Sequence, residues 1–301
     1  MRQELPANNF VVLCFLPNDL KYMDFSVLMS VYAKENPGYL DEALCSIWDR
    51  QTLKPGQIVL VKDGPLTMEL DDCISKWKEK LSDLLYVVEL PENVGLGAAL
   101  NSGLQQCKYE LVARMDSDDI CLKDRFEKQI KYFNENPNAT VASGYISEFK
   151  YNPGDIQSVR KVPLDHDKIA SCLKWRNAFN HMTVMFKKSV VLSVGGYNNK
   201  LTYFEDYDLW IRLVQTQYKA GNIPEILVNV RTGNDMIGRR HGLAYAKKEM
   251  SFFSLQKERG FISVSEYCLL ILFRIPLRLM PKNILICLYQ FLRHKKVTVT
   301  R

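Results

Sequence analysis

Apolar runs without polar alternation recur through the first 115 residues, and amphipathic segments separate them. We expect buried strands at 25–32, 57–62, 84–90 and 110–115, with helices at 37–48, 68–81 and 95–107. Strands that are apolar on both faces and joined by helices are typical of a parallel sheet covered on both sides. The sequence therefore predicts an α/β fold with a Rossmann-like, mostly parallel central sheet flanked by helices.

The second half of the chain has a less regular pattern. Helices are expected at 123–134 and 205–217, and strands at 140–149, 181–187 and 223–230, with a break at Gly195-Gly196. Apolar and basic residues then alternate in short stretches to the C-terminus, which predicts a helical tail. We therefore divide the chain into an N-terminal extension (1–23), a main α/β domain (24–235) and a tail (236–301).

Polar residues follow each of the four strands expected in the first half. They are Glu35, Asp63, Asn93 and the run from Asp116 to Asp119. Open α/β sheets bind their ligands at the carboxyl ends of the strands. Since four polar clusters coincide with four strand ends, the sequence predicts a ligand site at this edge of the sheet.

Three carboxylates, those of Asp116, Asp118 and Asp119, lie within four consecutive residues. A bound cation relieves their mutual repulsion, and Mg²⁺ and Mn²⁺ take oxygen ligands of this kind together with substrate phosphates. The alternative is that these acids only favour the first turn of the next helix, above all Asp119. We predict a site for Mn²⁺ or Mg²⁺ here.

A second acidic group opens the helix expected at 205–217. Asp206 is either a plain N-terminal helix charge or a general base that removes a proton from an acceptor hydroxyl. Asp208 and Arg212 have the spacing of an exposed ion pair between successive helical turns, so we give them a structural role.

Two further positions have open alternatives. His181 is expected mainly as a structural histidine, with a metal or phosphate ligand as the alternative. Arg239 and Arg240 are either contacts to a diphosphate or a solvated basic turn. The chain has no GxGxxG fingerprint and no GxxxxGK[ST] loop, which argues against a classical NAD enzyme and a P-loop NTPase.

The net charge of +6 over 301 residues lies entirely in residues 261–301, which hold seven Lys/Arg and one acid. The remaining body is neutral, which argues against nucleic acid as a partner. No uncharged stretch of the tail reaches the ~20 residues of a spanning helix. The tail is therefore expected to contact the surface of an anionic membrane, or alternatively to pack on the domain's own core.

None of the eight cysteines forms a CxxC pair, which argues against a zinc ribbon and a thioredoxin-type motif. We expect the cysteines within apolar stretches to be small core residues. The apolar run at 10–16 has no basic segment before it, so we do not interpret it as a signal peptide. Reduced cysteines and a cytoplasmic location are expected.

Several motifs, in this order, resemble glycosyltransferase family 2, which has the GT-A fold. They are SVLMSVYAKENPGYLDEALCSIWDRQ, IVLVKDGP, ENVGLGAALNSGL, ARMDSDD, VGGYNN and FEDYDLWIRL, and the resemblance covers roughly residues 24–232. It implies an inverting transfer from a UDP-sugar or another nucleotide sugar.

The resemblance also implies roles for single residues. Tyr32, Glu35 and Asp63 would line the pocket for the base and ribose, and Asn93 and Arg114 are grouped with them as nucleotide-sugar-binding residues. Asp118 would ligate the metal, and Asp116 would contact the ribose or the metal. Asp206 matches the catalytic base of the family. Glu205, His181, Arg239 and Arg240 remain as contacts to the acceptor or a diphosphate.

The basic, apolar tail makes the chain similar to bacterial enzymes that extend polyprenyl-diphosphate-linked sugars in O-antigen and surface polysaccharide assembly. By this similarity we expect a UDP-linked glucose or galactose as donor, and an undecaprenyl-diphosphate-linked sugar as acceptor. The product would be a β-glycoside, made at the cytoplasmic face of the inner membrane. The alternatives are a non-catalytic nucleotide-sugar-binding scaffold and a sugar nucleotidyltransferase.

Overall fold

A computed structural model describes residues 24–216, 218–233 and 240–281 of the chain. Its first half alternates strand and helix, as expected. The elements are β1 (Phe25–Val31), α1 (Pro37–Ile47), β2 (Gln57–Lys62), α2 (Met68–Leu81), the 3-10 turn η1 (Ser82–Leu84), β3 (Leu85–Glu89), α3 (Leu96–Gln106) and β4 (Leu111–Arg114). Strand β1 pairs in parallel with both β2 and β4, and β2 pairs in parallel with β3. The predicted α/β fold is confirmed.

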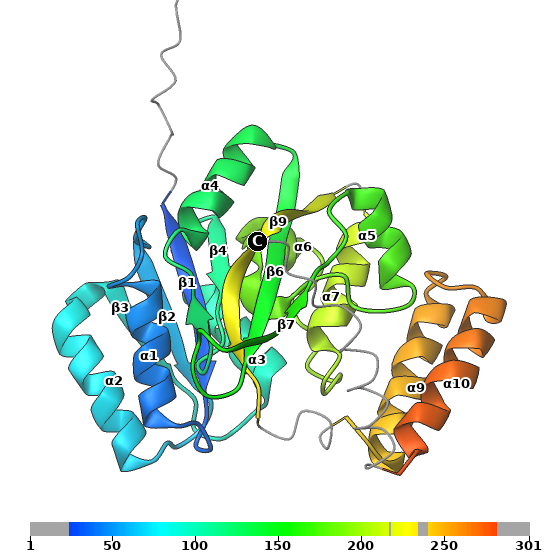
Figure 1. Cartoon of the computed structure of the whole chain (residues 1–301), viewed down its shortest axis with the longest axis horizontal. Helices are drawn as coiled ribbons and strands as arrows, with labels where there is room; N and C mark the ends of the chain where they lie inside the picture. The colour runs from blue at the N-terminus through cyan, green and yellow to red at the C-terminus, as the bar shows by residue number, and fades with distance from the viewer. Residues whose placement is uncertain (1–23, 217, 234–239, 282–301) are drawn as a thin grey trace, which may run out of the picture.

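The second half completes the sheet with strands of both directions. Its elements are β5 (Ile120–Cys121), α4 (Arg125–Glu135), β6 (Ala139–Phe149), β7 (Ile156–Arg160), α5 (His166–Leu173), the 3-10 turn η2 (His181–Thr183), β8 (Met185–Lys187), α6 (Lys188–Ser193), α7 (Glu205–Val214) and β9 (Lys219–Arg231). Within the described ranges the sheet order is β3-β2-β1-β4-β8-β6-β9-β5, and β7 pairs with β6 (Figure 1). Strand β8 is antiparallel to both β4 and β6, so it joins the two halves.

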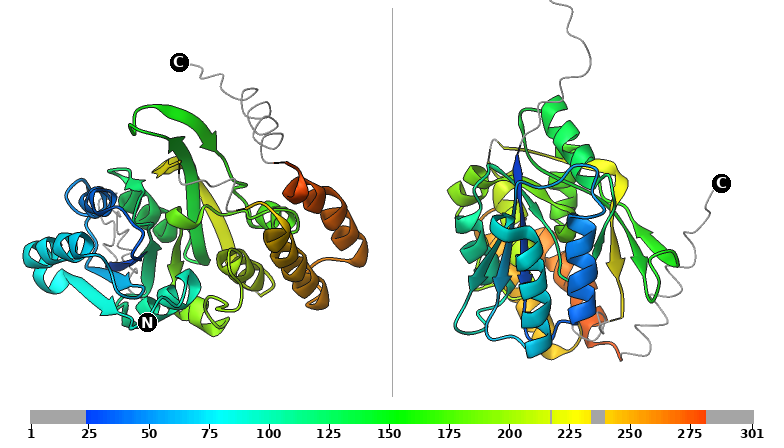
Figure 2. Two further views of the ribbon diagram at one scale, coloured as in Figure 1. Left: turned by 90° about the horizontal axis from the view of Figure 1, so that it is seen from below. Right: turned by 90° about the vertical axis from the view of Figure 1, so that its left-hand side faces the viewer.

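Two apolar clusters cover the two faces of this sheet, as the layers in Figure 2 show. One cluster holds side chains of α1, α2 and α4 with Val27 and Met29 of β1, and the other holds α3, α5 and α7 with Leu28. Successive strand residues point to opposite faces, so both kinds of position must be apolar. Helix α3 packs very closely, because a Cβ at Gly103 would lie 2.5 Å from Leu28 Cδ1.

The predictions from sequence were wrong for some elements of the second half. A strand was expected over 181–187, but residues His181–Thr183 form a 3-10 turn and only Met185–Lys187 is extended. The helix expected to reach residue 217 ends at Val214. Strands β5 and β7 and helices α5 and α6 were not predicted. Most of these are short, and the side chains of β7 are largely exposed, so they leave a weak apolar periodicity.

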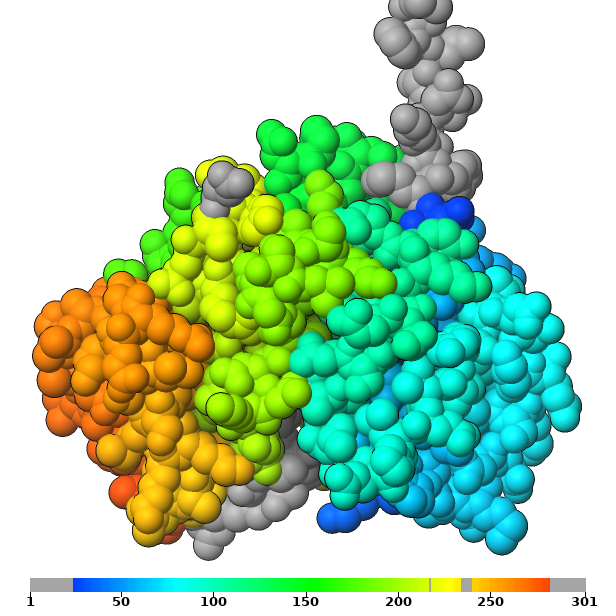
Figure 3. All heavy atoms as spheres, turned by 180° about the vertical axis from the view of Figure 1, so that it is seen from behind, coloured from blue at the N-terminus to red at the C-terminus, as the bar shows by residue number. Residues whose placement is uncertain are grey.

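The tail forms a helical hairpin of α9 (Leu243–Glu258) and α10 (Val264–Leu279), a separate lobe at one end of the molecule (Figure 3). Phe252, Phe253 and Leu270 join the cluster that contains α7, so part of the tail packs on the main domain. Glu249 of α9 is fully buried and pairs with Arg274 and Arg278 of α10.

These ion pairs correct one expectation for the tail. Arg274 and Arg278 were counted as basic residues that face an anionic membrane, but they neutralise Glu249 inside the hairpin. The apolar segments expected at 284–289 and 291–292 lie outside the described residues, and so do Lys282 and the basic residues after it. In the part of the chain that the structure describes, every helix is too short or too polar to cross a membrane.

Candidate active site

The acidic loop between β4 and β5 gathers three carboxylates. One oxygen from each of Asp116, Asp118 and Asp119 lies within 4.8 Å of the others. Burial, and then the charges of Asp116 and Glu35, raise the pKa of Asp118 to about 7. Burial and the same crowding also raise the pKa of Asp119. A set of oxygen donors that repel one another this strongly fits a divalent cation such as Mg²⁺ or Mn²⁺.

Two neighbouring elements hold the acidic loop in place. The Ser117 hydroxyl donates to Glu35 Oε2 at 2.7 Å, which ties the loop to the segment after β1. At the end of β9, the backbone N–H of Arg231 donates to Asp119 Oδ1 at 2.9 Å, and Arg231 Nε donates to the Asp118 carbonyl at 3.2 Å. Sequence reasoning missed both Ser117 and Arg231. Arg231 follows more than 100 residues after the loop, and no local pattern links the two.

Arg114 lies under this loop with only 2% of its surface exposed. It forms an ion pair with Asp116, while its Nε and Nη1 atoms are buried and have no hydrogen-bond partner among the described residues. Its charge lowers the pKa of His181 and counteracts the raised pKa of Asp206. The charge of Arg114 therefore acts on both the acidic loop and the second acidic group. Two of its donor atoms, Nε and Nη1, have no hydrogen-bond partner among the described residues.

The ends of β2 and β3 bring Asp63 and Asn93 together. Asp63 Oδ1 accepts the backbone N–H of Val94 at 2.8 Å, and Asn93 Nδ2 donates to the Asp63 carbonyl at 3.2 Å. Gly64 turns the chain here with φ +86°, and a Cβ would lie 2.7 Å from the Asn93 nitrogen. Tyr32, at the end of β1, is 41% exposed. These predicted nucleotide-binding residues all follow neighbouring strands at one sheet edge.

Asp206 occupies the first turn of α7. Its Oδ1 accepts the backbone N–H of Tyr207 at 2.8 Å, and its Oδ2 accepts Asn177 Nδ2 at 2.7 Å. Burial raises the pKa of Asp206, although the two hydrogen bonds oppose the effect. The carboxylate is fixed by two donors and still reaches solvent. This geometry suits a base that must accept a proton from a bound hydroxyl.

Glu205, next to Asp206, is largely buried by its surroundings. Burial and then the charge of Asp206 raise the pKa of Glu205 to about 7. Its Oε2 atom has no hydrogen-bond partner in the described part of the chain. Its Cβ and Cγ pack on Gly97 of α3, where a Cβ would lie 3.2 Å from Glu205 Cβ. Glu205 therefore keeps a buried carboxyl oxygen without a hydrogen-bond partner beside the proposed base.

Asp208 corrects the expectation of an exposed ion pair. Its side chain is fully buried and accepts hydrogen bonds from Arg212 Nε at 2.7 Å, Arg259 Nη1 at 2.6 Å and Gln256 Nε2 at 3.0 Å. The predicted i,i+4 pairing of Asp208 with Arg212 is confirmed. The predicted exposure of the pair is wrong, because α9 covers this side of α7. The cluster ties the helix that carries Asp206 to the C-terminal hairpin.

His181 has a structural partner, as favoured from the sequence. Its Nε2 lies 2.9 Å from the Tyr197 hydroxyl, and burial followed by the charge of Arg114 holds its pKa well below the usual range. It is therefore neutral at pH 7. Asn101 fixes Tyr197 through both of its backbone polar groups, at 2.8 Å each. Arg240 lies close enough to Asp206 for its charge to act on that carboxyl, whereas Arg239 lies outside the described residues.

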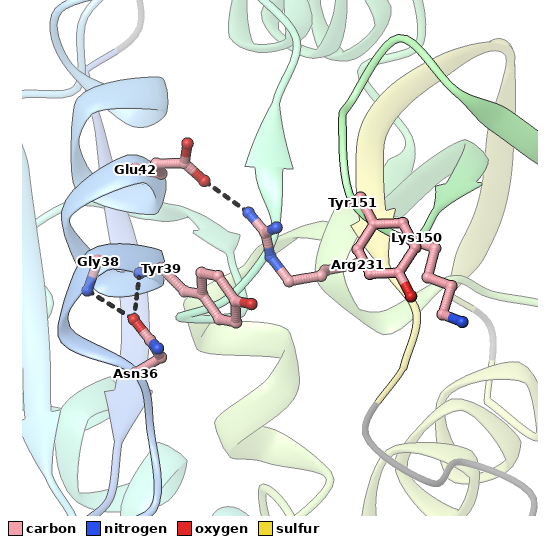
Figure 4. Close-up of a pocket in the computed structure, with 7 residues that line it drawn as sticks. All are labelled: Asn36, Gly38, Tyr39, Glu42, Lys150, Tyr151 and Arg231. Carbon is pink, nitrogen blue, oxygen red and sulfur yellow. Dashed lines mark hydrogen bonds and ion pairs between the residues drawn. The ribbon is translucent and has the colours of Figure 1, made fainter.

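Arg231, which contacts the acidic loop, also lines a pocket of about 350 Å³ (Figure 4). Arg231 stacks 3.8 Å above the Tyr39 ring and pairs with Glu42 at 2.5 Å. None of its lining residues was predicted as a site residue: Asn36, Gly38, Tyr39, Glu42, Lys150, Tyr151 and Arg231. These contacts explain why Arg231 is rigid enough to hold the loop.

Known proteins are similar to most of this chain. The model of glycosyl transferase family 2 matches residues 26–194. An uncharacterized glycosyltransferase of Haemophilus influenzae is 43% identical, over 90% of this chain and 100% of that protein. The amylovoran biosynthesis glycosyltransferase AmsE of Erwinia amylovora is 40% identical over 88% and 98%. An Escherichia coli protein named UDP-Gal:alpha-D-GlcNAc-diphosphoundecaprenol beta-1,3-galactosyltransferase is 38% identical over 86% and 92%.

Solved structures share the fold at low sequence identity. Staphylococcus aureus TarS 1-349 in complex with UDP-GlcNAc gives a TM-score of 0.61 at 17% identity, covering 83% of this chain and 70% of that one. The mannosyltransferase PcManGT of Pyrobaculum calidifontis, in complex with GDP-Man and Mn²⁺, gives 0.57 at 16% identity, covering 91% and 77%. Both likenesses concern the fold alone.

Proposed function

Because the chain belongs to glycosyl transferase family 2 and is a glycosyltransferase, we propose that it moves a hexose from a UDP-sugar to a lipid-linked sugar. The acceptor would be a hydroxyl of a polyprenyl-diphosphate-linked sugar, in the assembly of a bacterial surface polysaccharide. Galactose and glucose are the favoured hexoses. Support comes from the names of two relatives, one in amylovoran biosynthesis and one that transfers galactose to a diphosphoundecaprenol-linked sugar.

The main support for the proposal is the environment of the Asp206 carboxylate. Its carboxylate is held by Asn177 and by the backbone N–H of Tyr207, still reaches solvent, and has a raised pKa. Asp206 would take the proton of the acceptor hydroxyl as its oxygen attacks the anomeric carbon. The bond to the nucleotide diphosphate breaks on the opposite face, through an oxocarbenium-like transition state. A single displacement of this kind converts an α-linked donor into a β-glycoside.

Asp118 and Asp116 are the residues that would hold a divalent cation. When bound, Mn²⁺ or Mg²⁺ offsets the charge that develops on the departing diphosphate. Arg114 contributes a fixed positive charge beside Asp116. Tyr32, Glu35, Asp63 and Asn93 would line the nucleotide pocket at the ends of β1, β2 and β3.

The Asp118→Asn variant tests this proposal. It removes one acidic ligand while keeping the side-chain shape, so transfer measured with manganese and a UDP-sugar is expected to fall by about 10²–10³-fold. Asp49→Asn is the matched control, because it removes an aspartate from an exposed ion pair with Lys80. Both variants are assayed for release of UDP with a lipid-diphosphate acceptor. Full activity in Asp118→Asn contradicts the site, and release of pyrophosphate from UTP and a sugar phosphate identifies a nucleotidyltransferase instead.

We also propose that α10 contacts the cytoplasmic surface of an anionic membrane. Its outer side exposes large apolar residues at helical spacing, among them Leu269, Leu272, Phe273 and Leu279. Leu272 is 64% exposed and Phe273 is 67% exposed, which is unusual for side chains of this size. An apolar helix face of this kind suits the boundary between headgroups and acyl chains, where the lipid-linked acceptor also lies.

The double variant Leu272→Glu/Phe273→Glu is expected to weaken binding to anionic phospholipid vesicles by about 10²-fold or more, since two large apolar side chains lose their contact with lipid. Vesicle co-sedimentation of the full chain measures it. The control is Met68→Glu/Tyr86→Glu, which makes the same kind of change at exposed apolar positions of α2 and β3. Equal binding by the two double variants would overturn the assignment of α10. Deleting the tail is a poorer test, because Leu270 belongs to the core.

A further inference from the structure

Three arginines from separate parts of the chain gather around Asp206. Arg160 ends β7, Arg176 follows α5, and Arg240 precedes α9. Arg160 Nη2 donates to the Asn177 carbonyl at 3.1 Å, and Asn177 Nδ2 donates to Asp206 Oδ2 at 2.7 Å. This chain of contacts places the Arg160 guanidinium one residue away from the proposed base, and Arg176 is the residue next to Asn177.

Arg160 is also near enough to Arg240 and to Arg176 for their charges to act on it. Crowding by protein atoms, and then the positive charges of Arg240 and Arg176, lower the pKa of Arg160, while the charge of Asp206 acts in the opposite direction. Each of the three residues nevertheless remains exposed to solvent.

This group of arginines carries more positive charge than the protein neutralises. None of the three forms an ion pair with a carboxylate in the ranges that the structure describes. By contrast, Arg212, Arg259 and Arg274 nearby each have a buried carboxylate as partner. The carboxylates of Asp206 and Glu148 act on Arg160 with the opposite sign, so three guanidinium groups face two carboxylates. The remaining excess of positive charge is unfavourable unless an anion offsets it.

Resting on the proposed function, we propose that Arg160, Arg176 and Arg240 form a binding site for the diphosphate of the acceptor. Guanidinium groups bind phosphate oxygens through paired, charge-assisted hydrogen bonds, and a diphosphate offers enough oxygens for several of them. The donor's diphosphate would lie at the acidic loop, where Asp118 and Asp116 would hold the cation. The arginine cluster lies on the acceptor side, where it would fix the sugar that follows the diphosphate against the Asp206 carboxylate.

A binding experiment tests the site without relying on catalysis. Full-length protein is titrated with farnesyl diphosphate and, separately, with farnesol, in EDTA so that no metal contributes. Removing one guanidinium is expected to weaken binding of the diphosphate by about 10–100-fold, and the triple variant Arg160→Ala/Arg176→Ala/Arg240→Ala by more. Binding of farnesol stays unchanged. Arg50→Ala is the control, because Arg50 is an exposed arginine after α1 and lies outside the cluster.

Kinetics separate this inference from the proposed function. With a UDP-sugar donor and manganese, the triple variant should raise KM for a diphosphate-linked acceptor by about 100-fold or more, and leave KM for the donor unchanged. A phenyl glycoside of the same acceptor sugar, which has no diphosphate, should have the same KM with both proteins. If the wild type transfers sugar but the variant keeps its acceptor KM, the inference is overturned. If the wild type binds farnesyl diphosphate through these arginines but transfers no hexose, the inference stands and the proposed function is overturned.

Discussion

The Asp206→Asn variant is expected to lose about 10²–10⁴-fold in kcat, because the amide cannot accept the proton of the acceptor hydroxyl. The substitution keeps the size of the side chain and an oxygen that can accept from Asn177 or Tyr207, so the fold should persist. Initial rates with a UDP-sugar, manganese and a lipid-diphosphate acceptor measure the effect. The dissociation constant for UDP, measured by calorimetry, should not change, since Asp206 acts on the acceptor.

The pH dependence of the wild type gives a second measure of the same residue. Asp206 acts only when deprotonated, so kcat should rise with pH as this carboxyl loses its proton. Because burial raises the pKa of Asp206, the acid limb should lie above the range of an ordinary aspartate. Activity that is independent of pH from 4 upward, or an Asp206→Asn variant of normal kcat, would exclude Asp206 as the base.

Replacing Asp208 with Asn is expected to lower the free energy of unfolding by about 3–5 kcal/mol. The aspartate is fully buried and balances the charges of Arg212 and Arg259, so its neutral replacement leaves buried positive charge without a partner. Urea unfolding followed by circular dichroism measures the change, provided that the slope of the transition is conserved.

Asp165→Asn provides the matched comparison for Asp208. Asp165 also pairs with a nearby lysine, Lys168 at 2.7 Å, but its side chain is 66% exposed. Water and salt screen that pair, so the expected loss is below about 1 kcal/mol. Equal effects of the two substitutions would show that burial does not determine the strength of the Asp208 cluster. Since Asp208 shares α7 with Asp206, its loss should also lower activity, whereas Asp206→Asn should leave stability nearly unchanged.

The acidic loop shows how much of a candidate site can be predicted from the sequence. Asp116 and Asp118 were predicted as metal ligands because three crowded acids after an apolar strand repel one another unless a cation joins them. The structure brings these acids together. Asp206 was proposed as a base because an acidic pair opens an amphipathic helix. Arg231, Asn177 and Arg160 were not found. A single arginine or asparagine in a loop or at a strand end has no local pattern that distinguishes it from a solvated residue.

Asp208 shows the opposite error. The spacing to Arg212 was read correctly, and the exposed face was inferred because acids and bases normally face water. The inference failed because Arg259 and Gln256, about 50 residues further along the chain, supply the partners that make burial of the charge tolerable. The basic residues of the tail were likewise expected at a membrane surface, with packing on the core as the alternative, whereas Arg274 and Arg278 neutralise a buried glutamate.

By itself the sequence determined the alternating strands and helices of the first half, the edge of the sheet that carries the polar loops, and the acidic loop. These features follow from local periodicity and from the chemistry of neighbouring residues, which act over a few positions. The tertiary structure decided which charges are buried, which arginines remain without a counterion, and which of them surround Asp206. Such properties depend on the distances between segments far apart in the chain, and burial multiplies the strength of each charge interaction once water is excluded.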